Sequence, residues 1–351
     1  MPQYSHERLE YVKDVLSRFP SESSLALAKK LYAEHPEWFT SIDTARGVIR
    51  YQRGNRGKRN REQVADSSFL RPNQVAGQNA YPPSEAKPWS PYVLPKEIKR
   101  LLVISDLHIP FHADIAVQAA VSHGVKRQCD AVLINGDMGD FYEISRWERR
   151  PEDSSKAKMK SEIGAQGQFL DWLRTQFPLP IPIYVKFGNH DERWDSYIWR
   201  KGAELYDLPQ LRLDKILKEI RDDEGEVIGK RDIIFVKDRQ RIEYRNLTIL
   251  HGHELGRALS KPVNAARGVY MKTKMSILVG HYYTTSHHVG DDMLHKHQIS
   301  CWSVGALCEL HPFWLRANDW NWGFAIVEAT DNSDESFTVD NKRISLEGEV
   351  W

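Results

Sequence analysis

The chain has 351 residues, of which 49 are lysine or arginine and 48 are aspartate or glutamate, giving a formal net charge of +1. That length accommodates more than one domain, and the balanced charge identifies no partner. Its three cysteines, Cys129, Cys301 and Cys308, show neither zinc-type spacing nor an even disulfide framework, which favours a reducing compartment. The first residues lack a signal-peptide pattern, and no run of about 18 apolar residues predicts a membrane span. We therefore expect a soluble cytoplasmic protein.

Residues 5–53 are predicted to form three short helices, separated at Phe19-Pro20-Ser21 and at His35-Pro36-Glu37, because proline does not continue a helix. Apolar residues at helical spacing define one buried face in each helix. These faces consist of Leu9, Val12, Val15 and Leu16; of Leu25, Ala28, Leu31 and Tyr32; and of Ile42, Ala45, Val48 and Ile49. Ser41 is the expected N-cap of the third helix. The prediction is a small all-α domain over residues 1–61.

The most basic stretch of the chain includes the third helix and continues past it, with no acidic residue between its first and last members. It consists of Arg46, Arg50, Arg53, Arg56, Lys58, Arg59 and Arg61. Arg46, Arg50 and Arg53 recur at helical spacing and would share one face. DNA or RNA is one partner for such a surface, and three helices with a basic third one resemble a helix-turn-helix. A helical appendage with a solvated cationic face is the alternative.

The rest of the chain divides into a linker and a larger domain. Residues 62–97 hold six prolines among Asn, Gln, Ser and Gly, which predicts an irregular linker laid along the following domain. From Ile98 onward, apolar runs typical of buried strands alternate with helices expected at 114–127, 156–176 and 193–220. Asp222-Asp223-Glu224-Gly225 is an expected turn before a strand, and the final residues around Asn341 are expected to close the sheet as a hairpin. We predict an α/β domain over residues 98–351.

Five short motifs each follow one of the apolar runs. They are Asp106-Leu107-His108, Gly136-Asp137-Met138-Gly139-Asp140, Gly188-Asn189-His190-Asp191, His251-Gly252-His253 and Gly280-His281. Open α/β sheets place their active sites at the carboxyl ends of strands. Asp, His and Asn side chains suit Mn, Zn or Fe, and two ions about 3.5–4 Å apart can clamp a phosphate. The motifs therefore predict a two-metal hydrolytic site, with Asp137 as the shared carboxylate.

In this order the motifs resemble those of the calcineurin-like metallophosphoesterase superfamily, over about residues 98–330. The resemblance implies a β-sandwich flanked by helices and phosphoester hydrolysis by in-line attack of a hydroxide held between two divalent ions. The implied ligands are Asp106 and His108 for the first metal, Asp137 as the bridge, and Asn189, His251 and His281 for the second. His190 would contact the phosphate and protonate the leaving oxygen. Manganese is the expected metal, with Fe, Zn, Ni or Co as alternatives.

One position departs from the family pattern. Where the last family motif has a second histidine, which completes the shell of the first metal, this chain has Tyr283. Three outcomes are open: completion by water or by the nearby His287 and His288, a weakened first site, or ligation by the Tyr283 phenol. An inactive, binding-only relative is a further alternative. His253, beside a predicted ligand, is expected to support that ligand without binding metal itself.

An aromatic cluster follows the last motif, interleaved with Arg316 and Asn318. Its members are Trp302, Phe313, Trp314, Trp320, Trp322 and Phe324. Core packing is expected for most of them, although aromatic faces near the site would also stack nucleobases, and the run 318–323 is expected to form a loop at its rim. A basic domain tethered to a phosphoesterase favours a phosphodiesterase or nuclease acting on DNA or RNA. A phosphomonoesterase acting on protein or nucleotide and a catalytically impaired scaffold are the alternatives.

Overall fold

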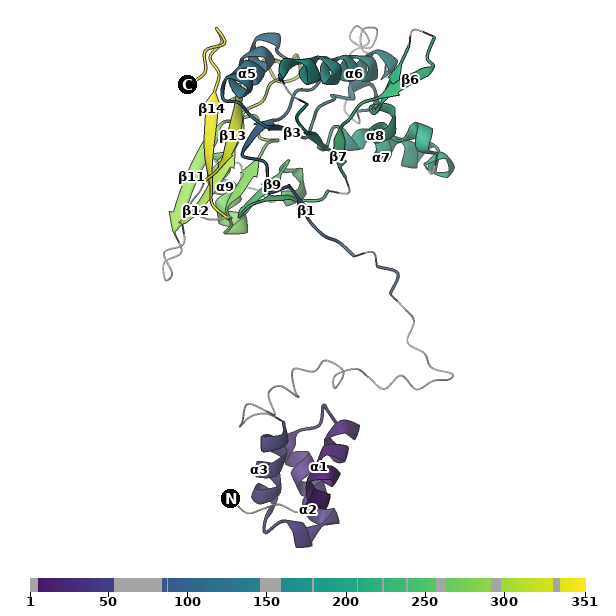
Figure 1. Cartoon of the computed structure of the whole chain (residues 1–351), viewed down its shortest axis with the longest axis vertical. Coiled ribbons are helices and arrows are strands. Elements are labelled where there is room, and N and C mark those ends of the chain that lie inside the picture. The colour runs from purple at the N-terminus through teal and green to yellow at the C-terminus, as the bar shows by residue number, and fades with distance from the viewer. Residues whose placement is uncertain are drawn as a thin grey trace. The chain divides into compact units, whose positions relative to one another are not determined.

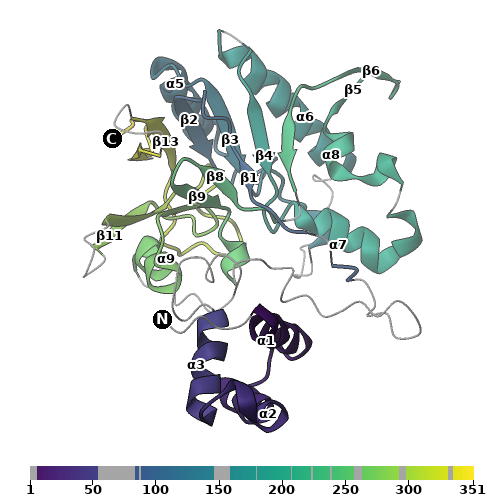
Figure 2. The same cartoon turned by 60° about the horizontal axis from the view of Figure 1, so that its bottom comes forward.

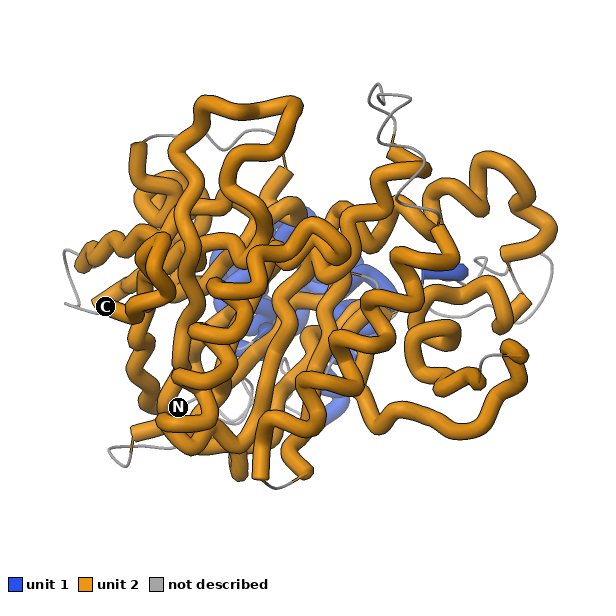
Figure 3. Tube along the Cα trace, turned by 90° about the horizontal axis from the view of Figure 1, so that it is seen from above, with its two compact units in different colours: residues 1–87 blue, residues 88–351 orange. Residues whose placement is uncertain are grey.

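The structure of the protein, a computed structural model, describes residues 6–53, 84–86, 88–145, 159–178, 180–206, 208–222, 224–237, 239–256, 263–291, 298–330 and 335–351. The chain divides into two compact units, Met1–Lys87 and Pro88–Trp351 (Figure 3). Residues 62–83 of the predicted linker lie outside the described residues, as do Arg56, Lys58, Arg59 and Arg61 of the basic stretch. Among the helices that the structure describes, none is long and apolar enough to cross a membrane.

The N-terminal unit has the three predicted helices. They are α1 (His6–Arg18), α2 (Ser24–Glu34) and α3 (Ile42–Gln52), with a short 3-10 helix, η1 (Pro36–Trp38), before the third (Figure 1). Ser41 is the N-cap of α3, because its hydroxyl oxygen accepts a hydrogen bond from the Thr44 backbone N–H at 3.2 Å. The prediction that Leu25 is buried was wrong. Leu25 is 41% exposed, because α2 is rotated so that Leu27 takes the buried position beside Ala28 and Leu31.

The C-terminal unit is a sandwich of two six-stranded sheets, as predicted (Figures 1 and 2). The first sheet has the order β14-β13-β2-β3-β4-β7, with β2 (Arg100–Ile104), β3 (Ala131–Asn135), β4 (Ile183–Lys186), β7 (Ile234–Val236), β13 (Gly323–Ala329) and β14 (Phe337–Arg343). The second sheet has the order β1-β8-β9-β10-β12-β11, with β1 (Tyr92–Val93), β8 (Ile242–Tyr244), β9 (Leu247–Leu250), β10 (Ile277–Val279), β11 (Ser286–Asp291) and β12 (Gln298–Ser303). The expected C-terminal hairpin is formed by β13 and β14, which pair antiparallel.

Both faces of the first sheet are buried. In β2, Leu101 and Val103 pack between the two sheets, whereas Leu102 and Ile104 pack against the layer that contains α5 (Asp114–Lys126) and α6 (Met159–Gln176). Strands β2, β3, β4 and β7 pair in parallel. Parallel strands covered on both faces need apolar residues at consecutive positions, which explains why the sequence shows continuous runs instead of alternation. Helix α9 (Ala265–Thr273) packs against strands β10, β11 and β12 of the second sheet.

Two segments differ from the sequence predictions. A single helix over 193–220 was wrong: α7 (Glu192–Lys201) stops before Gly202, and turns including η4 (Ala203–Leu205) and η5 (Pro209–Leu211) lead to the short α8 (Leu213–Ile216). Glycine and proline interrupt the helical pattern there. The predicted turn after residue 221 joins β5 (Glu219–Arg221) and β6 (Val227–Lys230), which form a separate hairpin.

The second sheet begins before residue 98, inside the segment that the sequence assigned to the linker. Strand β1 pairs in parallel with β8, and Leu94 and Ile98 are buried in the core between the sheets. The short apolar stretch around Tyr92 is therefore anchored to the second sheet, although its proline-rich composition conceals the strand.

Candidate metal centre

The loops that follow β2, β3, β4, β9 and β10 bring the predicted ligands together from both sheets. His251, after β9, donates a hydrogen bond from Nδ1 to the carbonyl oxygen of Asn135 at the end of β3, at 2.8 Å. Asp106, after β2, accepts one from the backbone N–H of His281, after β10, at 2.9 Å. These bonds link the carboxyl ends of strands in the two sheets, so the ligand-type residues meet at one edge of the sandwich.

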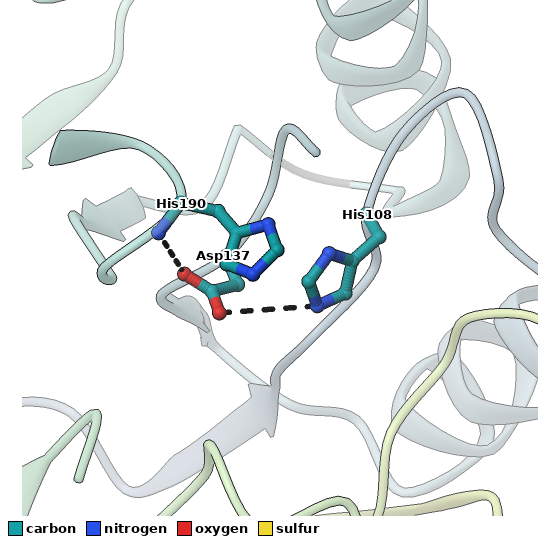
Figure 4. Close-up of side chains that lie close together, drawn as sticks. All are labelled: His108, Asp137 and His190. Atoms are coloured by element: carbon teal, nitrogen blue, oxygen red, sulfur yellow. Dashed lines mark hydrogen bonds and ion pairs between the residues drawn. The ribbon is translucent and has the colours of Figure 1, made fainter. Parts of the chain in front are cut away.

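Asp137 lies at the centre of this cluster and is fully buried. Its Oδ1 accepts a hydrogen bond from the backbone N–H of His190 at 2.8 Å, and its Oδ2 lies 3.8 Å from His108 Nε2 (Figure 4). On the other side, Oδ2 lies 3.2 Å from His251 Nε2, which is also 3.3 Å from Asn189 Oδ1. Asp137 thus lies between histidines from both sheets.

Two groups of metal-donor residues share Asp137. One contains His108, Asp137 and His190, and the other contains Asp137, His251 and His281; in each group the donor atoms lie within 4.8 Å of one another. A carboxylate common to two donor groups is what a pair of closely spaced ions requires.

Glycines permit this close approach. A Cβ atom on Gly188 would collide with Asp137 Oδ1, and one on Gly136 would collide with the ring of His251. A Cβ on Gly280 would meet Ser105 Oγ and Asp106 Oδ2. Replacing any of these three glycines would therefore displace a ligand or a residue that contacts one.

The backbone at the site is unusual as well. Five of the ten described non-glycine residues with positive φ belong to it: Asp106, His108, Asp137, His281 and Tyr283, with φ between 52° and 65°. This conformation is uncommon for residues with a side chain and clusters at functional sites, where the surrounding structure compensates its cost. Here it turns the chain sharply at the ends of strands that carry the ligands.

Buried polar atoms in the cluster fit bound cations. Asp106 Oδ1 and His281 Nδ1 are buried, and neither has a hydrogen-bond partner among the described residues. Such groups are costly unless a donor or an ion compensates them. Burial lowers the pKa of His251, but attraction by Asp137 outweighs this and raises it to about 10, so the cluster strongly favours positive charge. Carboxylate and imidazole donors without a thiolate suit divalent ions such as Mn, Fe or Zn.

His108 is held from two sides. Its Nδ1–H donates to the carboxylate of Asp140 at 2.8 Å, and in the neutral ring its Nε2 accepts a hydrogen bond from the Tyr283 hydroxyl, also at 2.8 Å. Burial raises the pKa of Tyr283 well above its ordinary value, so the phenol keeps its proton. The hydroxyl therefore engages the nitrogen through which His108 would bind a metal.

His287 and His288 lie away from this contact, on β11. The His287 ring stacks on Trp302, with 5.2 Å between the centroids, and His288 packs against Tyr270 at 4.8 Å. Neither belongs to the donor groups found among the described residues. Of the side chains considered as replacements for the family histidine, Tyr283 is the one that contacts His108.

The hydrogen bonds of His190 define its protonation state. Its Nδ1 donates to the carbonyl oxygen of Asp140 at 3.0 Å, and its Nε2 accepts from Arg193 Nη2 at 2.9 Å. Burial lowers the pKa of His190, which keeps the ring neutral. Arg193, three residues further on at the start of α7, also donates to the Asp140 carbonyl oxygen, at 2.8 Å. Arg193 belongs to none of the predicted sites, and its only signal in the sequence is its spacing of three residues from His190.

Two carboxylates inside the motifs position the site, although the sequence analysis gave them no role. Asp140 fixes the orientation of His108. Asp191 accepts hydrogen bonds from the backbone N–H groups of Gly188 at 2.8 Å and Gly139 at 3.1 Å, which ties the loop after β4 to the loop after β3. Burial raises the pKa of Asp191 to about 7. Their place directly beside predicted ligands was the signal for both.

A buried ion pair supports the His251 loop. Lys186 Nζ lies 2.8 Å from Glu254 Oε1, and Glu254 Oε2 accepts the backbone N–H of Gly252 at 2.8 Å. Burial by itself would raise the pKa of Glu254. The charges of Lys186 and His253 outweigh this effect and lower the pKa from 4.5 to about 2. His253 itself packs 5.4 Å from the His251 ring and contacts Glu192 at 3.2 Å, outside the two donor groups.

Residues 99–308 match the calcineurin-like phosphoesterase family. The chain belongs to this family. Two relatives of the phosphoesterase, both called Gene 54 protein, come from Mycobacterium phages D29 and L5; each is 26% identical to it, over 263 and 268 residues, and the matches cover 72% of this chain and 98% of each relative. Solved structures similar to it include a dimetal phosphatase from Danio rerio, at 12% identity, covering 70% of this chain and 96% of that one with a TM-score of 0.35. Another is Vps29 from Entamoeba histolytica, at 13% identity, 72% and 96% coverage and a TM-score of 0.34.

Membership supplies the general chemistry. The family hydrolyses phosphoesters and typically binds two divalent metal ions, although some members are scaffolds without catalysis. The donor groups of this phosphoesterase fit two such ions.

A cavity of about 350 Å³ lies beside His108 and His190 of the phosphoesterase. Its aromatic lining consists of Phe111, Tyr142, Tyr283, Phe313, Trp314 and Trp320. The remaining aromatic residues of the C-terminal cluster, Trp302, Trp322 and Phe324, are buried in the core. Core packing therefore holds for three of the six rings. In the run 318–323, Trp320 lines the cavity, whereas Trp322 is buried and Gly323 begins β13.

The basic residues in α3 and at its C-cap differ in their contacts. Arg53 donates to Ser24 Oγ at 3.0 Å and to the Glu22 carbonyl oxygen at 2.6 Å, so its guanidinium connects the end of α3 to the start of α2. Arg50 is exposed, and Arg46 is half-buried. Arg53 therefore has a structural contact within the helical unit, while Arg50 presents its charge to solvent.

Proposed function

We propose that the phosphoesterase hydrolyses phosphodiesters, with DNA or RNA as the substrate class and manganese as the metal. The proposed ligands are Asp106, His108, Asp137, Asn189, His251 and His281, with Asp137 shared. The observation that carries the proposal is the pair of donor groups built on Asp137, which borders an accessible aromatic cavity. A phosphate held at Asp137 would have room for a substituent on the His108 side.

Two divalent ions, when bound, would activate a water molecule and offset the charge of the phosphate. The residues of the chain supply the remaining steps. Asp137 and His251 would hold the ions from the two sheets. Arg193 turns from His190 to a phosphate oxygen, because a guanidinium matches phosphate better than it matches an imidazole nitrogen. His190 Nε2, released by Arg193, would take up a proton from a water molecule and pass it to the departing oxygen.

The polymer assignment is supported by the basic N-terminal unit. An exposed Arg50, with Arg46 on the same face of α3, would contact successive phosphates and keep the catalytic unit near its bonds. We expect the double variant Arg46→Ala/Arg50→Ala to bind DNA and RNA more weakly and to reduce the slope of log affinity against log salt by up to about 2, since each phosphate contact contributes roughly 0.9. Lys13→Ala, which removes an exposed cation of α1, is the control. Unchanged salt dependence in the double variant would contradict the tether.

The decisive experiment is Mn-dependent hydrolysis of an aryl phosphodiester and the matching phosphomonoester by the full chain, with Asp137→Asn alongside. Diester turnover that disappears in Asp137→Asn supports the proposal. Turnover of the monoester alone would replace it with a phosphomonoesterase acting on protein or nucleotide. Diester turnover that persists in Asp137→Asn would contradict the shared-carboxylate site.

A second candidate, a catalytically impaired scaffold, is favoured by one observation: the Tyr283 hydroxyl engages His108 Nε2. Tyr283→His tests it by restoring the family residue. A large gain in turnover would mean that the natural first site is impaired. No change, or a loss, would mean that the site is completed in another way and that the scaffold candidate fails.

A further inference from the structure

The aromatic cavity borders the metal centre, and the Tyr283 ring contacts both. Tyr283 contacts His108, with 5.5 Å between the ring centroids and an interplanar angle of 25°, and stacks on Trp320 at 4.2 Å. The cavity is also lined directly by His108, Asp140 and His190. A group bound in the cavity would therefore lie next to a phosphate held at Asp137.

A second set of packed rings lines the same cavity. Tyr142 stacks with Trp314 at 6.3 Å and 22°, and Phe313 meets both Tyr142 and Trp314 edge-on, at 6.1 and 4.9 Å. Tyr142 is 7% exposed, so the base of this wall is fixed, whereas Trp314 is 51% exposed and offers its indole to solvent. Such an indole, supported from behind by buried rings, is a surface on which another flat ring can stack at little entropic cost.

We infer that this cavity binds one nucleobase of the substrate, adjacent to the phosphate that is cleaved. The inference rests on the proposed function and names the part of the nucleic acid that the site recognises.

Polar groups at the cavity favour a nucleobase over a plain aromatic ring. Ser145, Arg193 and Glu309 also line the cavity. A base carries hydrogen-bond donors and acceptors along its edge, and a carboxylate such as Glu309 accepts from base amino groups. The side chain of a tyrosine or phenylalanine would leave most of these groups without a partner.

The size of the cavity limits the form of the substrate. Its volume of about 350 Å³ is near the lower end of the 300–1,000 Å³ that ligand pockets typically have. That space suits a single base with its sugar and excludes a paired duplex. The substrate is therefore a single strand, a strand end or a nucleotide turned out of a helix.

Direct binding of a nucleoside tests the inference without metal and without catalysis. We expect adenosine and thymidine to bind the full chain in a calorimetric titration in EDTA, and Trp314→Ala to weaken this binding by roughly tenfold or more, as expected for one base–aromatic stack. Trp314→Phe keeps an aromatic face and should lose less. Trp351→Ala, which removes a tryptophan that is 62% exposed at the C-terminus, is the matched control and should bind as wild type.

A kinetic comparison adds a second readout. The p-nitrophenyl ester of thymidine 5′-phosphate carries a base, whereas methyl p-nitrophenyl phosphate does not. We expect Trp314→Ala to lower the ratio of kcat/KM for these two diesters by roughly tenfold. An unchanged ratio, together with the absence of nucleoside binding, would overturn the base site while leaving diester hydrolysis intact.

Two other outcomes separate the inference from the proposed function. Binding of N-acetyltyrosinamide without binding of either nucleoside would overturn the base site in favour of an aromatic peptide side chain. Nucleoside binding that depends on Trp314, without turnover of any diester, would overturn the proposed function and support the base site by itself.

Discussion

The two halves of the metal centre are built differently. On the His251 side, consisting of Asn189, His251 and His281, the His251 ring is fixed by a backbone carbonyl and its Nε2 points at Asp137. On the His108 side, consisting of Asp106, His108, Asp140 and Tyr283, the His108 ring is fixed by a carboxylate and its Nε2 is engaged by a phenol. In the first half the neighbouring carboxylate already favours a positive charge, and a metal ion would replace the proton on His251 Nε2; in the second half a metal ion must displace the Tyr283 hydroxyl.

The difference separates two roles. We expect the His251 side to bind its metal ion more tightly and the His108 side to lie nearer the substrate. Breaking a neutral hydrogen bond costs roughly 0.5–1.5 kcal/mol, so we expect the His108 side to bind its ion more weakly. The same side borders the aromatic cavity through Tyr283. Its weaker ion would thus be the one that lies nearest the variable part of the substrate.

We expect the largest effect from a variant that alters both halves of the metal centre. Asp137→Asn replaces the carboxylate shared by the two donor groups, so we expect turnover to fall below detection and bound manganese to fall below two ions per chain. Metal analysis after gel filtration and diester hydrolysis measure this. Asp171→Asn, which alters a surface carboxylate paired with Arg231, is the control and should retain both properties.

The next variant acts on the His251 side alone. Glu254→Gln leaves Lys186 buried without a counter-charge, and we expect a loss of about 3–5 kcal/mol in the free energy of unfolding at pH 7. Urea unfolding measures it. Asp171→Asn, at an exposed carboxylate, should cost less than about 1 kcal/mol. An equally small loss in Glu254→Gln would show that the ion pair does not support this loop.

The same pair predicts a dependence on pH. The pKa of Glu254 is lowered from 4.5 to about 2 in the folded protein, so the folded state binds fewer protons there than the unfolded chain. Its contribution to stability is complete above pH 4.5 and is lost as the pH falls toward 2. The stability difference between wild type and Glu254→Gln should therefore shrink over this range. A constant difference would contradict the assignment.

On the His108 side, Asp140→Asn removes the carboxylate that orients His108. We expect the weaker of the two metal affinities to fall by about 10–100-fold, the usual effect of losing such a support, while the tighter affinity changes little. Isothermal titration with Mn²⁺ resolves the two. If both affinities fell equally, the halves would not be separable in the way that we describe.

We expect the smallest effect from a variant that removes only the Tyr283 hydroxyl. Tyr283→Phe keeps the stack on Trp320 and removes the hydrogen bond to His108, so the weaker metal affinity should rise by roughly fivefold, equivalent to about 1 kcal/mol. A lower affinity in the same titration would show that the Tyr283 oxygen is itself a ligand.

The sequence predicted the strands of the sandwich correctly where the apolar residues of a segment by themselves indicate a buried strand. Continuous apolar runs such as Leu101–Ile104 identified the parallel strands because both faces of that sheet are buried. It failed between residues 202 and 220, where Gly202 and Pro209 break a pattern that otherwise looks helical. It also missed β1, whose pairing with β8 depends on a segment far away in the chain.

The motifs alone predicted the candidate ligands, with Asp137 as the proposed bridge, because donor chemistry and position after a strand are properties of the sequence. Only the tertiary structure decided what surrounds them. In the tertiary structure Tyr283 contacts His108, whereas His287 and His288 lie on β11. Arg193 contacts His190, and Lys186 is buried against Glu254. These contacts join residues from separate loops, and their distances follow from the packing of two sheets, which no local pattern encodes.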